Sequence, residues 1–351
     1  MTDNVLDDVI EPGLRAQALS LTEIPVIDVG ALFTDELAAR QATAQQIGTA
    51  CREIGFFYVK NHGISEQHIA ATFAAARQFF ALPLARKQAI AIERSPCHRG
   101  YFALGGENLD PLRQQGAGDL KEGIKIGRDL PPDHPRVRAG TPLHGPNQWP
   151  SDLPGWQETM QDYYTACQQL GLRLMRAFAL ALELPEAYFD AYLREPMATL
   201  GPLHYPPQRG AITEAQIGAG AHTDFGCLTL LAQDASGGLQ VRNVAGEWLE
   251  APPIPGTLVV NIGDMLARWT NDQFRSTVHR VINRSGAERY SLPFFYDPEF
   301  DTPLACLETC TRPDNPSRYS PTTAGQYLLD RINETFAYQR AAEGDVRKIS
   351  I

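Results

Sequence analysis

The chain has 351 residues and an ordinary globular composition, with 43% hydrophobic and 21% charged side chains. Its length allows one large domain or two medium ones around a sizeable core. Lys and Arg number 31 against 41 Asp and Glu, which gives a formal net charge of −10. This acidic balance argues against a protein that coats nucleic acid or docks on anionic membranes, because both need a positive surface field.

Targeting signals and cysteine usage indicate a compartment. No apolar run approaches the ~20 residues that a helix needs to cross a bilayer, and the acidic start lacks the pattern of a secretory signal. The six cysteines are dispersed, and one close pair, Cys306 and Cys310, is a weak zinc signal without a second pair. Such usage is typical of reduced thiols. We therefore expect a cytoplasmic protein without a nucleic-acid or membrane partner.

Residues 1–150 predict an N-terminal α/β part. Two apolar runs predict strands, and two stretches with helical periodicity predict helices; the strands are expected at 25–28 and 55–59 and the helices at 45–54 and 69–80. Residues 95–150 are rich in Gly and Pro and show little periodicity. A stretch of this length is typical of an active-site rim, a lid or a wrapping arm.

Residues 151–351 predict a long helix, a β-rich region and a closing helix. Apolar residues recur at three- and four-residue steps through 154–184, which predicts a scaffold helix about 45 Å long if straight. Between residues 203 and 296 short apolar runs alternate with turn residues, which is typical of a sandwich or barrel. We expect these strands at 227–231, 239–241, 248–249, 257–262, 277–282 and 290–295, and the last helix at 322–338.

The most informative segment contains His222 and Asp224. Residues two apart on a strand point to the same face, so an imidazole and a carboxylate can be aimed at one point. His279, in another strand-like run, can supply a second imidazole. Two His and one carboxylate on one face of an ion leave positions open for substrates and O2 on Fe(II). The spacing alone is a weak signal, because any protein offers several such pairs.

A second pair follows ten residues beyond His279, where Arg289 and Ser291 should share a strand face. A guanidinium fork and a hydroxyl can hold one carboxylate, since the planar donors of Arg match it in a bidentate manner. An Arg inside a barrel needs an anion, because an unpaired buried charge is costly. The pair therefore predicts a carboxylate-binding site.

These residues together resemble the Fe(II)/2-oxoglutarate-dependent dioxygenases, specifically the isopenicillin N synthase-like branch. The similarity covers most of the chain, and the order and spacing of its motifs make the match specific although each tripeptide is not. The segments that resemble the N-terminal signature are 24–28 and 55–64, and those that resemble the catalytic signature are 222–224, 237–241, 261–264, 279–281 and 289–291.

The resemblance implies an α+β fold with a double-stranded β-helix (jelly-roll) core and flanking α-helices. The parts would be an N-terminal region, 1–150, and a catalytic region with its long and C-terminal helices, 151–351, in one globule. His222, Asp224 and His279 match the Fe(II) ligands.

The resemblance also implies how the cosubstrate binds. Arg289 and Ser291 match the pair that grips the distal carboxylate of 2-oxoglutarate, and Tyr205 matches a tyrosine that adds a hydrogen bond. This chain has Leu203 where many relatives have Asn. The implied enzyme consumes 2-oxoglutarate and O2, releases succinate and CO2, and oxidises a small organic substrate by hydroxylation, desaturation or ring closure.

Two alternatives stay open at this level. An oxidase like isopenicillin N synthase would use iron and O2 without 2-oxoglutarate, and its Arg–Ser pair would hold the carboxylate of the substrate itself. A non-catalytic barrel would bind a ligand or a redox-inert metal such as zinc. Substrate determinants are expected at 95–150, at 208–220 and in the C-terminal tail, where no motif is readable. We expect a monomer or a weak homo-oligomer.

Several other polar residues need not belong to the site. His204 should point away from the face of Tyr205, which favours a packing role. Asn261 is expected at a strand end and turn rather than at a second metal site. Residues 119–122 are equally compatible with a substrate-facing rim and with a solvated loop.

Overall fold

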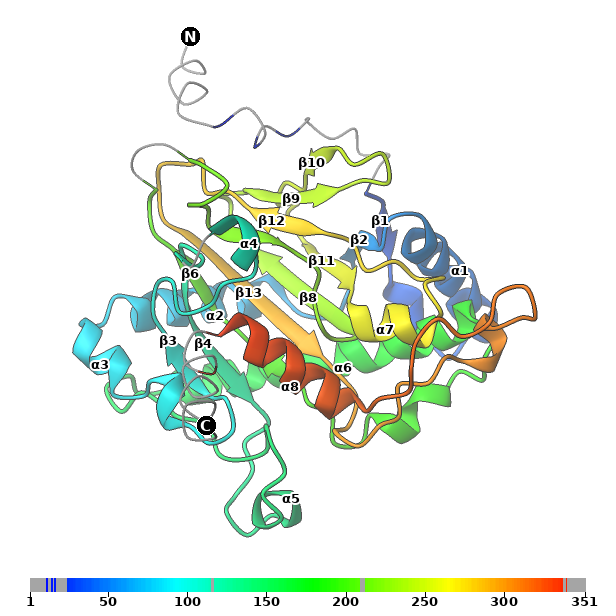
Figure 1. The fold of residues 1–351 in the computed structure, drawn as a ribbon, viewed down its shortest axis with the longest axis horizontal. Helices are drawn as coiled ribbons and strands as arrows, with labels where there is room; N and C mark the ends of the chain where they lie inside the picture. The colour runs from blue at the N-terminus through cyan, green and yellow to red at the C-terminus, as the bar shows by residue number, and fades with distance from the viewer. Residues whose placement is uncertain are drawn as a thin grey trace, which may run out of the picture.

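A computed structural model describes residues 24–114, 117–208 and 212–336, together with residues 11, 14, 16 and 339. The acidic N-terminal start, residues 115 and 116 of the expected rim, residues 209–211 of the expected substrate-determining loop 208–220 and the C-terminal tail therefore lie outside the described residues. So do positions 337 and 338 of the last expected helix. Two sheets form the core (Figure 1), and strands of both sheets line one cavity between them.

The larger sheet has nine strands and combines segments from both halves of the chain. Its order is β1 (Val26–Asp28), β2 (Phe56–Lys60), β11 (Thr257–Ile262), β8 (Leu228–Gln233), β13 (Arg289–Tyr296), β5 (Thr199–Leu200), β4 (Glu122–Gly127) and β3 (Gly100–Phe102), and β6 (Leu203–Tyr205) pairs with β13 and β4. The smaller sheet has the order β10 (Trp248–Glu250), β9 (Leu239–Arg242), β12 (His279–Val281) and β7 (Ala219–His222). This arrangement confirms the expected jelly-roll core.

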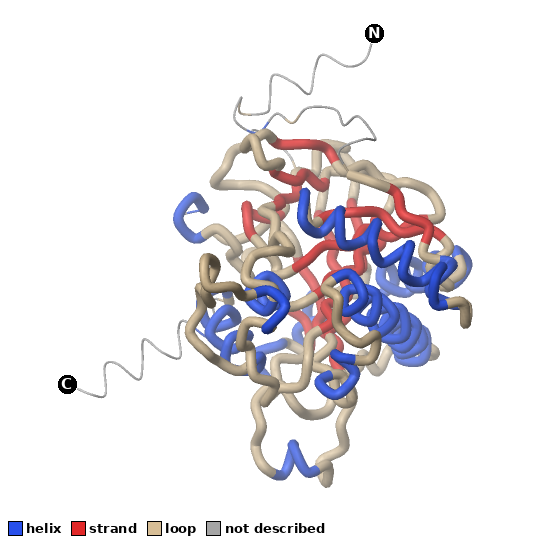
Figure 2. Tube along the Cα trace, turned by 90° about the vertical axis from the view of Figure 1, so that its right-hand side faces the viewer, coloured by secondary structure: helices blue, strands red, loops and turns tan. Residues whose placement is uncertain are grey.

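Helices cover the larger sheet, and the last of them contributes side chains to the cavity lining. The long helix α6 (Trp156–Ala181) packs against α1 (Leu37–Glu53), α2 (Glu66–Phe80) and the strands β8 and β13. Figure 2 shows the helices gathered around the strands from the side, and Figure 1 shows α8 (Ala324–Thr335) crossing in front of the sheet. The shorter helices are α3 (Leu84–Gln88), α4 (Pro111–Gln114), α5 (Pro135–Arg138) and α7 (Asp264–Trp269), with 3-10 turns at Gly30–Phe33, Ile92–Arg94, Tyr188–Tyr192 and Glu308–Cys310.

The periodicity of α6 explains its position. Its 26 residues span about 39 Å at the rise of an α-helix, slightly less than the expected length. The apolar stripe expected from the sequence is buried throughout, and its members are Met160, Tyr163, Cys167, Leu170, Leu174 and Phe178. One face of the helix is therefore removed from water against the sheet, which stabilises the fold through the hydrophobic effect.

Strand β13 separates the core from the cavity. Successive side chains of a strand point to opposite faces. One set packs into the hydrophobic core on the side of α6, and it comprises Tyr290, Leu292, Phe294 and Tyr296. The other set lines the cavity, and it comprises Arg289, Ser291, Pro293 and Phe295. The same alternation thus builds the core and places Arg289 and Ser291 on one cavity wall.

The expected irregular segment 95–150 contains ordered strands. Within it, β4 lies between β5 and β3 in the larger sheet and also pairs with β6. Lys and Gly residues in β4 obscure the apolar alternation that normally identifies a strand. The charged side chains are buried in ion pairs instead of facing water, so a local polarity pattern could not reveal the strand.

Among the described residues, no helix is long and apolar enough to span a bilayer.

Candidate active site

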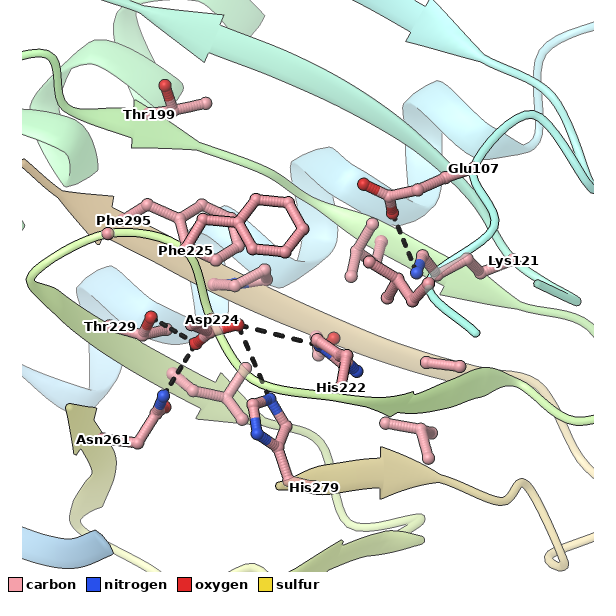
Figure 3. A pocket seen from close by; sticks show the side chains of 18 of the residues that line it. Glu107, Lys121, Thr199, His222, Asp224, Phe225, Thr229, Asn261, His279 and Phe295 are labelled. Carbon is pink, nitrogen blue, oxygen red and sulfur yellow. Dashed lines mark hydrogen bonds and ion pairs between the residues drawn. The ribbon is translucent and has the colours of Figure 1, made fainter. Parts of the chain in front are cut away.

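The three expected metal ligands converge at one end of the smaller sheet. His222 ends β7 and lies opposite His279, the first residue of β12, while Asp224 follows in the turn after β7. Asp224 Oδ1 is 3.7 Å from His222 Nε2 and 3.6 Å from His279 Nε2. The donor atoms of the three side chains lie within 4.8 Å of one another. Figure 3 shows the three side chains pointing toward one another.

The imidazoles present their Nε2 atoms toward the shared centre. His222 Nδ1 is 2.7 Å from the carbonyl oxygen of Gly220, and His279 Nδ1 is 3.1 Å from that of Thr277. A carbonyl oxygen only accepts, so each Nδ1 carries a proton, and Nε2 is the ring nitrogen that faces the shared centre. Burial, together with the charge of His279, lowers the pKa of His222 to about 3. His222 is therefore neutral at physiological pH, as a metal ligand must be.

The carboxylate of Asp224 is held in one orientation. Its Oδ2 accepts hydrogen bonds from Thr229 Oγ1 at 2.5 Å and from Asn261 Nδ2 at 2.7 Å, so Oδ1 faces the imidazoles. Burial opposes ionisation, but His279, His222 and Asn261 hold the pKa of this carboxyl below its usual range. Two imidazole nitrogens and an ionised carboxylate oxygen on one side of a centre form the donor set that suits Fe(II) with open positions.

The orienting role of Thr229 and Asn261 can be tested. We expect Thr229→Val and Asn261→Ala to weaken Fe(II) binding by about 10- to 100-fold. Each substitution removes a hydrogen bond to Asp224 Oδ2, and these hydrogen bonds orient the carboxylate so that Oδ1 faces the centre. The Fe(II) Kd would be measured anaerobically by competition with a chromophoric chelator. Thr257→Val is the matched control, since Thr257 donates only to Ile254 O outside the cavity. Wild-type affinity in both site variants would contradict the role.

The expected carboxylate site also assembles. The Arg289 side chain is buried and lies over the Tyr205 ring, with 4.6 Å from the guanidinium carbon to the ring centre. Arg289 Nε donates to Gly237 O at 2.6 Å, and Nη1 lies 3.5 Å from Ser291 Oγ. Within the part of the chain that the structure describes, no carboxylate lies within 4.0 Å of this guanidinium. The site is therefore suited to an anion that a ligand supplies.

Residues 119–122 are not a solvated loop, because Asp119, Lys121 and Glu122 are buried, and Lys121 lines the cavity. Lys121 is 2% exposed and lines the cavity together with Glu107. Figure 3 shows both across from the triad, which is formed by His222, Asp224 and His279. Glu122 points to the opposite face, where its Oε1 is 2.8 Å from His204 Nδ1. The His204 ring stacks on Tyr290 at 4.8 Å outside the cavity lining.

The sequence analysis gives no role at the site to Glu107, Lys125 and Thr229, and it expects Asn261 only at a strand end and turn, although all four line the cavity. Asn261 is the single amide in the apolar run of β11, and this position was the one available signal. Its partner Asp224 is 37 residues away, a separation that no local pattern spans.

The chain is similar to known proteins over most of its length. The model of the family described as "non-haem dioxygenase in morphine synthesis N-terminal" matches residues 24–152, and that of the "2OG-Fe(II) oxygenase superfamily" matches residues 194–298. The 2-oxoglutarate-Fe(II) type oxidoreductase hxnY of Emericella nidulans is 39% identical over 91% of this chain and 92% of its own length. Homoarginine-6-hydroxylase 2-ODD-C23 of Glycine max is 35% identical over 91% of this chain and 99% of its own.

A solved structure has the same fold. A full-length Neurospora crassa protein, crystallised in complex with alpha-KG and 5-formyluracil, matches with a TM-score of 0.77 and 33% identity. The match covers 89% of this chain and 96% of that one.

Proposed function

The chain belongs to the Fe(II)/2-oxoglutarate-dependent oxygenase superfamily, and we propose that His222, Asp224 and His279 bind the iron. The observation that carries this proposal is the convergence of two imidazole Nε2 atoms and one oriented carboxylate oxygen within 4.8 Å. When bound there, Fe(II) supplies the redox chemistry that couples oxidative decarboxylation of 2-oxoglutarate to oxidation of the substrate.

The protein is an oxidoreductase that uses Fe(II), 2-oxoglutarate and O2 to oxidise a small organic substrate. Its relatives are 2-oxoglutarate-Fe(II) oxidoreductases, and the similar Neurospora crassa protein binds alpha-KG, so the comparisons support use of this cosubstrate and not the oxidase alternative. Succinate and CO2 are the products formed from 2-oxoglutarate.

We propose that Arg289, Ser291 and Tyr205 hold the distal carboxylate of 2-oxoglutarate. The buried guanidinium, which has no carboxylate partner among the described residues, supports this role, because the bound cosubstrate would provide the counter-charge. Arg289 would fix the far end of the cosubstrate, and Ser291 would add a hydroxyl donor. The apolar cavity walls, including Phe225 and Phe295, would exclude water from the reacting end.

We also propose the expected division into an N-terminal part, 1–150, and a catalytic part, 151–351, which share one sheet. The pairing of β2 with β11 and of β4 with β5 supports an integrated globule. A cytoplasmic location is proposed from the six cysteines, which are all free thiols and mostly buried. We propose a monomer or weak homo-oligomer, without a nucleic-acid or membrane partner, on the acidic net charge of −10.

The assignment is tested by anaerobic addition of Fe(II) and 2-oxoglutarate to the metal-free protein. We expect a visible charge-transfer band that needs both components, followed by steady succinate formation when O2 is admitted. A band without succinate would contradict turnover of 2-oxoglutarate. Absence of the band, with tightly bound zinc on elemental analysis, would support the non-catalytic alternative.

A further inference from the structure

Three lysines are buried in the described part of the chain, and one of them differs from the others. Lys87 Nζ donates to Glu122 at 2.7 Å, and Lys121 Nζ lies 2.5 Å from Asp119 Oδ2. The third, Lys125, has its nearest carboxylate oxygen, Glu107 Oε1, at 3.9 Å. Among the described residues no acceptor lies within hydrogen-bond distance of Lys125 Nζ.

The surroundings of Lys125 are aromatic. Its Nζ lies 5.1 to 5.7 Å from the ring centres of Phe102, Phe295 and Phe336. Aromatic faces attract a cation but do not replace a hydrogen-bond acceptor. Burial lowers the pKa of Lys125, while Glu107 opposes this effect. A buried ammonium whose N–H groups have no acceptor destabilises the fold. Because Lys125 lines the cavity, a bound ligand can supply the missing hydrogen-bond acceptor.

Glu107 offers the matching acceptor. Its Oε2 is 2.9 Å from Lys121 Nζ, whereas Oε1 faces Lys125 at a distance too long for a hydrogen bond. Burial opposes ionisation, but Lys121 and Lys125 lower the pKa of Glu107 to about 2. The cavity wall therefore carries an ionised acceptor and an ammonium donor side by side. Their charges cancel, which favours a bound group without net charge.

This donor–acceptor pair is distinct from the Arg289 site. Lys125 lies over the ring of Phe295, which is six residues from Arg289 along β13, or about 20 Å at the rise of a strand. Phe295 is paired with Thr229, the residue that contacts Asp224. The pair thus lies at the level of the triad, across the cavity from it, where a primary substrate can reach both.

Resting on the proposed function, we propose that Lys125 and Glu107 bind the primary substrate through neighbouring acceptor and donor groups that carry no net charge. Lys125 donates to the substrate acceptor, and Glu107 accepts from the substrate donor. Two kinds of compound share this chemistry: the C(=O)–NH edge of a cyclic amide and the paired carboxylate and ammonium of an α-amino acid. The aromatic and aliphatic lining around the pair suits an apolar or planar body.

The test uses the anaerobic full-length protein loaded with Fe(II) and 2-oxoglutarate. Binding of 2-pyridone, L-phenylalanine and benzoate, which has an acceptor only, is measured by isothermal titration calorimetry. We expect 2-pyridone or L-phenylalanine to bind more tightly than benzoate. We expect Lys125→Met and Glu107→Gln to weaken the preferred probe by about tenfold or more. Lys125→Gln retains N–H donors, and its affinity should fall between wild type and Lys125→Met.

Lys60→Met is the matched control, because Lys60 lies 3.9 Å from Asp28 in the same kind of loose ion pair, but half-exposed and outside the cavity. It should bind every probe as the wild type does, and all variants should retain wild-type affinity for 2-oxoglutarate. The proposal would be overturned if benzoate bound most tightly or if no probe bound. It would also be overturned if Lys125→Met and Lys125→Gln bound the preferred probe with unchanged affinity. If the wild type did not bind 2-oxoglutarate, that result would instead refute the proposed function.

Discussion

Asp224→Ala and His279→Ala are each expected to reduce iron-dependent succinate formation to the background of the metal-free protein. Asp224 supplies the one carboxylate oxygen at the centre, and His279 supplies one of its two imidazole nitrogens. Either substitution leaves two donors for the ion, and Asp224→Ala also leaves the amide of Asn261 without its acceptor. The loss should therefore include metal affinity as well as turnover.

The measurement is succinate formation over a Fe(II) titration, combined with the anaerobic Fe(II) Kd. His134→Ala is a suitable control, because this imidazole caps the protruding helix α5 and does not line the cavity. Its activity should match the wild type. Iron-dependent turnover that persists in either triad variant would remove the basis for the assigned metal centre.

Arg289→Ala should weaken binding of 2-oxoglutarate by about 100-fold while Fe(II) binding changes little. Arg289 is 1% exposed, so its charge-assisted hydrogen bonds to the distal carboxylate would form away from bulk water, and the Ala variant would leave that carboxylate without them. Arg289→Lys should recover only part of the affinity, because a single ammonium lacks the planar pair of donors. The two Kd values would be measured separately, with the protein handled anaerobically.

Arg242→Ala provides the matched control on the neighbouring sheet, since this exposed guanidinium donates to Gly246 O and lies outside the cavity. An Arg289→Ala enzyme with an unchanged KM for 2-oxoglutarate would count against the cosubstrate site. Equal losses of iron and cosubstrate affinity would point to a general disturbance of the cavity instead of a specific contact.

The cavity has two cationic positions with different partners. Arg289 lies over Tyr205 with no carboxylate of the described residues nearby, whereas Lys125 lies beside Glu107. The first position suits an anion, and the second suits a neutral group with a donor and an acceptor. This difference would let the enzyme separate its cosubstrate from its substrate by charge within one cavity.

The sequence alone determined those features that depend on short-range periodicity. Residues two apart share a strand face, so local spacing was enough to identify Arg289 and Ser291 as a pair on β13. The same reasoning selected His222 and Asp224, although β7 ends at His222 and Asp224 lies in the turn that follows. The stripe of α6 was equally evident, because three- and four-residue steps define a helix face. The assignment of these residues to iron and 2-oxoglutarate came from the resemblance of ordered motifs.

Only the tertiary structure determined which distant polar residues meet. Asn261 contacts Asp224 across 37 positions, and Lys125 lies beside Glu107 although they belong to a segment with no readable pattern. Sheet register and burial create these contacts, and neither is encoded in the residues next to each partner. A charged side chain looks like a surface residue in sequence, and its buried role emerges only when the fold brings its counter-charge within a few ångströms.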